Sequence, residues 1–316
     1  MSPTAARAAA LAPGSIGNIG PGLDVLGMAI TGPGDRVIAE RSDVRGVTIA
    51  DAGHRELPTE ADRNTAGIAA IEVLKRVAPA EGVRLTIEKR LPLAGGQGGS
   101  AASAVAGAVA VNRLFGDRLD VHALLECALE AETAVAGRQA DNVAPSLLGG
   151  IALVRSVDPM DVVSLPVPDD LRIVLATPDQ RLRTAEARAV LPSLIARDRM
   201  VAQMANVAAM VAALASGDLA LLGRALDDQI AEPARARLLP GFVQAKAAAL
   251  MAGALGGSIS GAGPTSFYLV DSDALADQVA AAVRAAYAGL GIACRAWRAR
   301  VAPRGALTLP GDAEGA

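Results

Sequence analysis

The sequence predicts an α+β protein built in two parts, and three observations support that prediction. Segments with the period of a strand alternate with segments of helical spacing along most of the chain. A stretch with three prolines at Asp158–Asp170 interrupts this alternation near the middle. The length of 316 residues suits roughly two domains of about 150 residues each. We therefore expect one domain over 1–160, a second over 161–303, and a disordered tail over 304–316.

The first part is expected to mix short strands with longer helices. Strands are indicated by β-branched residues or by alternation of apolar and polar residues, at 5–11, 36–40, 44–50, 83–89 and 151–154. Helices are indicated at 64–77, 100–114 and 121–136. Asn64 is a suitable N-cap for the first of these helices. The second is apolar on most faces, so we expect it to be buried.

The second part is predicted from the same patterns. Strands are expected at 171–176, 266–270 and 293–301. Helices are expected near 199–215, 218–229, 242–251 and 274–288. The sequence contains no obvious internal repeat, so a repeat architecture is not indicated.

Composition and charge exclude several classes of function. Thirty Lys and Arg against thirty-three Asp and Glu leave a net charge of −3, which argues against nucleic acid as the main partner. No apolar run approaches the roughly 20 residues that span a membrane. Only two cysteines and two histidines occur. A disulfide framework, a zinc site and a Ser-His-Asp triad are therefore not expected.

A glycine-rich segment, Pro92–Ala102 (PLAGGQGGSAA), lies between a predicted strand and a predicted helix. Glycines let backbone amides approach an anion, and the start of a helix adds the positive end of its dipole. The segment is not a Walker A loop, because the terminal Lys-Ser/Thr pair is missing. It also matches G-x-G-x-x-A at Gly96, Gly98 and Ala101, so a dinucleotide site is an alternative. Taken alone, the segment fits a structural turn equally well.

Two further glycine-rich segments flank this one in the sequence. Ala12–Gly27 contains five glycines together with Asn18 and Asp24, and Asn and Asp are also ordinary turn residues. Gly256–Ser266 joins a predicted helix to a predicted strand, where a sharp turn explains the glycines equally well. The order of the three segments is more specific than any one of them.

In this order the segments resemble the signature motifs of the superfamily of galactokinase, homoserine kinase, mevalonate kinase and phosphomevalonate kinase. Within that superfamily the sequence is most similar to the homoserine kinases. The resemblance covers about residues 8–300 and includes GNIGPGLDVLG at 17–27, DNVAPSLLGG at 141–150, TAEARAVLP at 184–192 and EPARARLLPGF at 232–242. The last two segments each carry an arginine, which separates this family from the mevalonate kinases.

Three positions depart from the pattern of the family. Gln97 stands where the family has Leu, and Gly99 stands where it has the first Ser of its phosphate motif. Gln139 stands where the family usually has His, three residues before the Asn of the DN segment. A glutamine donates a hydrogen bond but carries no charge near neutral pH, so this change bears on the choice of substrate.

The resemblance implies a ribosomal-protein-S5-like N-terminal domain, a ferredoxin-like C-terminal α/β sandwich and an active site in the cleft between them. It implies that ATP is bound by Asn64, Pro92, Leu93, Ala94, Gly95, Gly96, Gln97, Gly98, Gly99, Ser100, Ala101 and Ala102. Ser100 and Glu132 are implied as ligands of Mg²⁺. The substrate is implied to contact Asn18, Asp24, Asn142, Arg188 and Arg235, with the two arginines on its carboxylate.

The implied activity is transfer of the ATP γ-phosphoryl group to L-homoserine in the cytoplasm, a step of threonine biosynthesis. Homodimers are common in the family, so we expect a homodimer. Three alternatives remain: a sibling kinase with a different hydroxylated acceptor, a non-catalytic nucleotide sensor, and a dinucleotide-binding oxidoreductase. Turnover would exclude the sensor, and a panel of acceptors would distinguish the sibling kinase. Binding of ATP without binding of NAD(H) would exclude the oxidoreductase.

Overall fold

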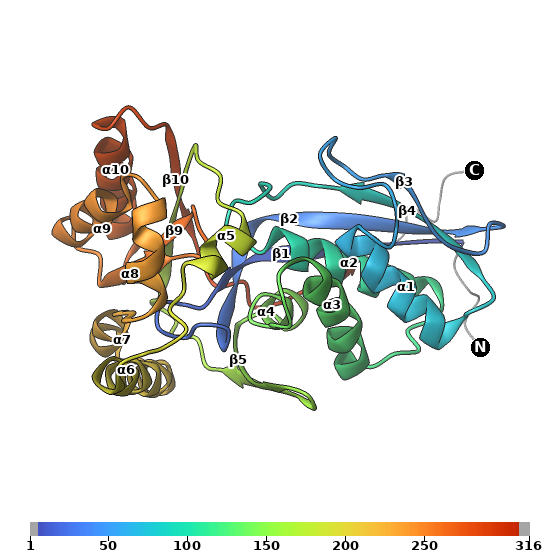
Figure 1. The fold of residues 1–316 in the computed structure, drawn as a ribbon, viewed down its shortest axis with the longest axis horizontal. Helices are drawn as coiled ribbons and strands as arrows, with labels where there is room; N and C mark the ends of the chain where they lie inside the picture. The colour runs from blue at the N-terminus through green and yellow to red at the C-terminus, as the bar shows by residue number, and fades with distance from the viewer. Residues whose placement is uncertain (1–5, 310–316) are drawn as a thin grey trace.

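The computed structural model describes residues 6–309, in which two β-sheets are each covered by helices (Figure 1). The strands are β1 Arg7–Gly17, β2 Leu26–Ser42, β3 Gly46–Asp51, β4 Gly82–Glu88, β5 Ile151–Val157, β6 Met160–Leu165, β7 Arg172–Pro178, β8 Gly256–Ile259, β9 Ser266–Val270, β10 Cys294–Ala299 and β11 Leu307–Leu309. The helices are α1 Thr65–Val77, α2 Gly99–Leu114, α3 Val121–Val135, α4 Val143–Leu148, α5 Thr184–Ala189, α6 Arg197–Ser216, α7 Leu219–Ala225, α8 Ala231–Arg235, α9 Phe242–Met251 and α10 Asp273–Ala288. A short 3₁₀ turn, η1, spans Ala236–Leu238.

The first sheet has the order β11-β1-β2-β4-β3, and β5 joins it by pairing with the other end of β2 and with β6. Its pairs are antiparallel except for β3 beside β4. Helices α1, α2 and α3 lie together over one face of this sheet (Figure 1). Small residues allow close packing there, because a Cβ at Gly107 of α2 would lie 2.6 Å from the Ala66 carbonyl oxygen of α1. This packing fixes the start of α2, which borders the site described below.

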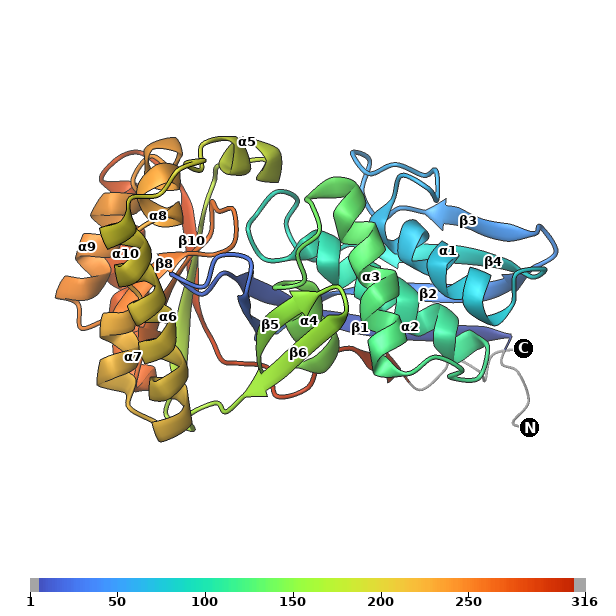
Figure 2. The ribbon, with the colours of Figure 1, turned by 60° about the horizontal axis from the view of Figure 1, so that its bottom comes forward.

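The second sheet has the antiparallel order β10-β7-β9-β8 and is buried on both faces. Alternate residues of β7 face opposite layers: Ile173 and Leu175 join the core with α6 and α7, while Val174 and Ala176 join the core with α9 and α10. The first of these cores also takes in apolar residues of β1 and β2. The two sheets therefore share buried surface, and Figure 2 shows α6 and α7 side by side in the second part.

The expected α+β fold in two parts is confirmed, with corrections at several elements. The proline-rich stretch at the expected boundary contains β6, so the first sheet extends to Leu165. The glycine-rich Gly256–Ile259 is strand β8, paired with β9. The helix expected at 218–229 ends at Ala225. The expected tail is not disordered at Leu307–Leu309, which pair with β1, and residues 310–316 lie outside the described range.

Among residues 6–309, α6 is the one helix long and apolar enough to cross a membrane, with 22% of its apolar window buried. It qualifies the expectation that no such segment exists. In the structure α6 packs beside α7, and its Met210 and Leu214 are buried in the core of the second sheet. The helix is therefore part of the folded second half.

Candidate active site

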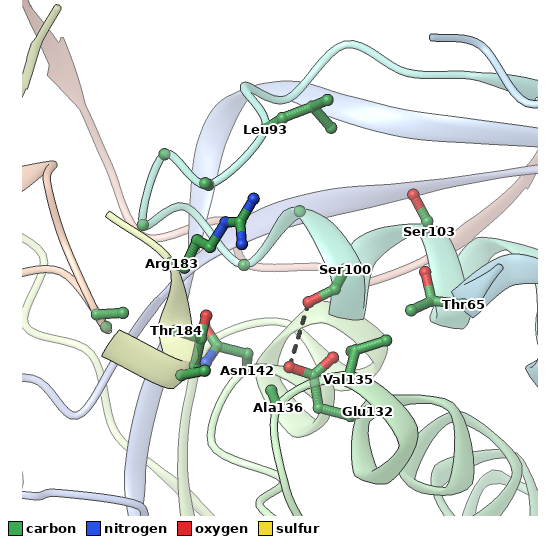
Figure 3. A pocket seen from close by; sticks show the side chains of 18 of the residues that line it. Thr65, Leu93, Ser100, Ser103, Glu132, Val135, Ala136, Asn142, Arg183 and Thr184 are labelled. Carbon is green, nitrogen blue, oxygen red and sulfur yellow. Dashed lines mark hydrogen bonds between the residues drawn. The ribbon is translucent and has the colours of Figure 1, made fainter. Parts of the chain in front are cut away.

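A pocket of about 520 Å³ lies between the two parts of the chain (Figure 3). Its walls come from the glycine segment before α2, the turn between β1 and β2, the facing ends of α1 and α3, and helix α5 from the second part. Most of the predicted site residues line it: Asn18, Asp24, Asn64, Pro92, Leu93, Ala94, Gly95, Gly96, Gly98, Gly99, Ser100, Glu132, Asn142, Arg188 and Arg235. The fold therefore brings segments that are far apart in the sequence into one site.

Three of the predicted residues have side chains outside this pocket. Ala101 and Ala102 are fully buried in the core of the first part. Gln97 is 2% exposed, and its side chain turns toward the second sheet. Its Nε2 donates to the hydroxyl oxygens of Thr177 at 3.0 Å and Thr265 at 3.4 Å. None of these three residues lines the pocket.

The glycine segment ends where α2 begins, at Gly98. This residue has a φ of 63° and no side-chain cap for the helix, so the first amides of α2 have no side-chain partner there. A Cβ at Gly98 would lie 2.0 Å from Ser15 Oγ, and a left-handed φ disfavours other residues. Free amides and the positive end of the helix dipole favour an anion at this place.

The same segment is tied to the second part of the chain. Ser260 Oγ donates to the Gly96 carbonyl oxygen at 2.5 Å. The Thr265 amide donates to the Gly95 carbonyl oxygen at 3.4 Å. Together with the bond from Gln97 to Thr177, these contacts fix the loop against β7 and the turn after β8. The glycine-rich segment Gly256–Ser266 thus supports the glycine segment before α2.

Behind the loop lies a buried ion pair between Lys89 and Asp35, whose side chains are 5% and 0% exposed. Lys89 Nζ also donates to the Gly99 carbonyl oxygen at 2.6 Å and to Ser103 Oγ at 3.1 Å. A Cβ at Gly99 would lie 3.0 Å from Lys89 Nζ. The glycine that departs from the family motif therefore sits directly against this buried ammonium group.

An acidic side chain lies opposite the start of α2. Glu132 on α3 is 6% exposed, and its Oε1 accepts a hydrogen bond from Ser100 Oγ at 3.2 Å, while its Oε2 has no partner among the described residues (Figure 3). Burial raises the pKa of Glu132 to about 7 and outweighs the opposing effects of Ser100 and Lys89. The unpartnered oxygen can accept a proton or a cation.

On the other side of the pocket, Asn18 has a φ of 68° and is held by several hydrogen bonds. Its Nδ2 donates to the Gly261 carbonyl oxygen at 3.2 Å, and its Oδ1 accepts from the Asp24 amide at 3.1 Å. Its own amide donates to Asp141 Oδ2 at 3.1 Å. Burial, followed by the nearby Asp24 carboxylate, raises the pKa of Asp141 to about 6. Asp141 therefore fixes the turn that presents Asn18 and Asp24.

Two arginines complete this side. Arg188 on α5 makes two hydrogen bonds to the Asp24 carboxylate, which raise the pKa of Arg188. Arg235, at the end of α8, is 4% exposed and donates to the carbonyl oxygens of Gly261 at 2.8 Å and Ala187 at 3.1 Å. Burial, followed by the nearby Arg188, lowers the pKa of Arg235. The two guanidinium groups form a cationic corner suited to a carboxylate.

Sequence reasoning missed several residues that line or support the pocket. Asp141 precedes the predicted Asn142 directly, so its motif already contained a signal. The only sequence signal for Lys89 was its place at the end of the strand predicted before the glycine segment. Arg183 had no signal of its own, because it precedes the arginine-bearing segment by one position. Gln139, where the family usually has His, does line the pocket.

Comparisons with known proteins identify the family of this chain. The family described as GHMP kinases N terminal domain matches residues 64–150, and GHMP kinases C terminal matches residues 210–289. A homoserine kinase of Chlorobium phaeobacteroides (strain BS1) is 41% identical over 87% of this chain and 90% of its own length. A homoserine kinase of Xanthomonas campestris pv. campestris (strain B100) is 40% identical over 92% of this chain and 90% of its own. The crystal structure of homoserine kinase from Cytophaga hutchinsonii superposes with a TM-score of 0.93 at 40% identity, covering 98% and 99% of the two chains.

The fold and the pocket define a small-molecule kinase of the GHMP type, a phosphotransferase that uses ATP. Within that class, the chain belongs to the homoserine kinase family.

Proposed function

We propose that this protein transfers the γ-phosphoryl group of ATP to the side-chain hydroxyl of L-homoserine, giving ADP and O-phospho-L-homoserine in threonine biosynthesis. The observation that carries the proposal is the joint pocket, in which the amides before α2 face the cationic corner of Arg188 and Arg235. One side suits a chain of phosphates and the other suits a carboxylate. A small amino acid with a terminal hydroxyl group fits between them.

On the donor side, the backbone of Gly95–Ser100 is assigned to the ATP phosphates, because its amides and the α2 dipole attract negative charge. Asn64 already caps α1, through the amides of Ala66 at 3.0 Å and Gly67 at 3.5 Å, and it is assigned to the nucleoside end. The flanking Pro92, Leu93 and Ala94 line the pocket and limit access of water.

Ser100 and Glu132 fit a magnesium ion. The unpartnered Glu132 Oε2 and the neighbouring Ser100 hydroxyl are hard oxygen donors, and Mg²⁺ takes one or two such ligands beside phosphates and water. No group of three or more His, Cys, Asp or Glu side chains within residues 6–309 is arranged to hold a metal. We therefore propose that Ser100 and Glu132 hold Mg²⁺ together with the phosphates. The ion would neutralise charge on the phosphate oxygens.

On the acceptor side, we assign the substrate carboxylate to Arg188 and Arg235, and its amino and hydroxyl groups to Asn18, Asp24 and Asn142. Asn142 Oδ1 accepts a hydrogen bond from Ser15 Oγ at 2.9 Å, which leaves its amide group free to face the pocket. Asp24 orients the substrate and does not serve as the base. Phosphoryl transfer depends more on position and charge than on covalent help from the protein.

The test is an ADP-release assay with ATP and Mg²⁺ on the purified chain. L-Homoserine is compared with L-serine, L-threonine, mevalonate and no acceptor. Turnover restricted to L-homoserine supports the proposal. Turnover with another acceptor would instead indicate a sibling kinase whose choice of substrate follows from Gln139, which lines the pocket. No turnover in a chain that binds ATP would indicate a nucleotide sensor.

We also propose that residues 1–160 bind ATP and that residues 161–303 contribute Arg188 and Arg235 to the substrate side, beside the substrate-side residues of the first part. We propose that the protein works in the cytoplasm as a homodimer, without a nucleic-acid or membrane partner. Met200, Val201 and Met204 of α6 are exposed and offer an apolar surface for self-association. Sedimentation equilibrium tests the dimer, and a variant with Val201→Lys and Met204→Lys is expected to shift it toward monomer.

A further inference from the structure

We propose that Arg183 is a further catalytic residue, whose guanidinium group contacts the phosphoryl group during its transfer. This inference rests on the proposed function and deepens it. It starts from a difference among the arginines of the pocket. Arg188 pairs with Asp24, and Arg63 lies 3.8 Å from Glu60. Arg183 lines the same pocket, but its side chain makes no hydrogen bond or ion pair with any described residue.

The backbone on either side of Arg183 is fixed. Leu182 is 6% exposed and Ala187 is fully buried, and both belong to the small apolar cluster with Leu239 and Phe242. The Ala187 amide donates to the Arg183 carbonyl oxygen at 3.0 Å, which closes the first turn of α5. Arg183 itself is extended, with a φ of −72° and a ψ of 141°. The side chain is therefore free, but it starts from a fixed point at the rim.

Its direction is visible in the close view. In Figure 3 the Arg183 side chain extends from the start of α5 toward the glycine segment, with Thr184 and Asn142 below it in the view. All of these residues line one pocket. The donor-side amides precede α2, and Asn142 is on the acceptor side. The guanidinium group thus has access to the region between them, where the transferred group must pass.

The chemistry of the step explains what a cation does there. The acceptor hydroxyl oxygen forms a bond to the γ-phosphorus, the bond from that phosphorus to the bridging oxygen breaks, ADP leaves with the bonding electron pair, and the hydroxyl proton is released to solvent. Charge spreads over the equatorial phosphate oxygens during this exchange. A planar guanidinium group donates two hydrogen bonds to such oxygens. The other pocket cations already have partners, so Arg183 is the one available for this task among the described residues.

The test compares Arg183→Met and Arg183→Lys with a matched control, Arg181→Met. Arg181 lies two positions earlier, is exposed and pairs with Glu56 across the chain. For each protein, kcat and KM are measured with L-homoserine. The affinities for ADP and for adenylyl imidodiphosphate, a non-hydrolysable ATP analogue, are measured by calorimetry. Circular dichroism checks the folding of each variant.

We expect Arg183→Met to lower kcat by about 10²- to 10³-fold, as removal of a donor to developing charge does elsewhere. Arg183→Lys recovers part of kcat, because it keeps the charge but loses the fork. Arg183→Met weakens binding of the ATP analogue about 10-fold and leaves ADP binding unchanged. A kcat equal to that of Arg181→Met, or an equal loss for both nucleotides, overturns the proposal. If the wild type does not phosphorylate L-homoserine, the proposed function fails, and the two nucleotide affinities still decide the role of Arg183.

Discussion

The Asp24 carboxylate occupies the fork of the Arg188 guanidinium group, with distances of 3.0 Å from Nη2 to Oδ1 and 3.2 Å from Nη1 to Oδ2. The two side chains are 33% and 35% exposed, and they join the turn after β1 to helix α5. A substrate carboxylate that binds Arg188 competes with Asp24 for the same donors. If the substrate carboxylate displaces Asp24 from Arg188, Asp24 would face the cationic amino group of the same substrate. The ion pair between Asp24 and Arg188 would then be replaced by two ion pairs with the substrate.

We expect Arg188→Lys to raise the KM for L-homoserine and to lower kcat/KM by about 10- to 100-fold, because a lysine cannot form the two parallel hydrogen bonds of a guanidinium group. The KM for ATP should change little. Steady-state kinetics with each substrate varied in turn measures both. The matched control is Arg224→Lys on the exposed side of α7, which should behave as wild type. An unchanged KM for L-homoserine would exclude Arg188 as the carboxylate ligand.

We expect Glu132→Gln to stabilise the ligand-free protein at pH 8. The pKa of Glu132 in the folded state is about 7, above its ordinary value of 4.5, so between these two pH values the folded protein holds a proton that the unfolded chain has lost. The free energy of unfolding therefore falls as the pH rises from 4.5 to 7, by about 3 kcal/mol in all. Glutamine removes this loss, so its benefit is full at pH 8 and small at pH 5.

Urea unfolding of ligand-free wild type and variant at pH 5 and pH 8 measures this difference. Glu130→Gln is the control, since Glu130 lies on the same helix but is 43% exposed and pairs with Arg138. Equal effects of the two substitutions, or a benefit that does not grow with pH, would show that Glu132 is not a buried, uncompensated carboxylate. The same Glu132→Gln variant should lose Mg²⁺-dependent turnover.

We expect Gly98→Ala to weaken ATP binding more than 10-fold, an order of magnitude that corresponds to about 1.4 kcal/mol. Its new Cβ would collide with Ser15 Oγ and displace the start of α2. The left-handed φ adds a strain of about 1–2 kcal/mol. Gly116→Ala separates the two effects, because Gly116 has a φ of 86° and no atom within 4 Å of a new Cβ. In a nucleotide titration, the affinity of Gly116→Ala for ATP should equal that of the wild type. Similar affinities of the two variants would contradict a role for the close approach of Gly98 to Ser15.

We expect Lys89→Met to destabilise the protein by about 3–5 kcal/mol, because it leaves the fully buried Asp35 carboxylate without its cation. The double variant Lys89→Met with Asp35→Asn should be more stable than Lys89→Met alone, since the uncompensated charge is gone. Urea unfolding of the two single variants and the double variant forms a thermodynamic cycle. Simple additivity of the two single effects would mean that the pair is not coupled.

Much of the fold could be predicted from the sequence, since the period of apolar residues decides helix or strand wherever a segment is long. Strand β8 was missed because it has only four residues and starts with two glycines. It forms a strand through its neighbour β9, and a Cβ at Gly257 would lie 2.3 Å from the Tyr268 ring. That is a tertiary contact which no local pattern contains.

Most of the residues named from the sequence line one pocket, but the sequence could not give the directions of their side chains. Motifs named the glycine segment, but they could not tell that the Gln97 side chain turns away from the pocket toward Thr177. The pairing of Asp24 with Arg188 joins residues 164 positions apart, and no local sequence pattern indicates it. The Arg183 side chain has no partner among residues 6–309, which is a property of the folded pocket and not of a motif.

Hydrogen bonds that involve Gln97, Ser260 and Thr265 join the two halves of the protein. Through them, the glycine segment of the first half is held by polar atoms of the second half. A chain cut after β6 would retain every strand of the first sheet except β11. Its glycine segment would nevertheless lose the hydrogen bonds to the second half. The conformation of this segment therefore depends on both halves of the chain. We therefore expect the two halves to unfold together as one cooperative unit.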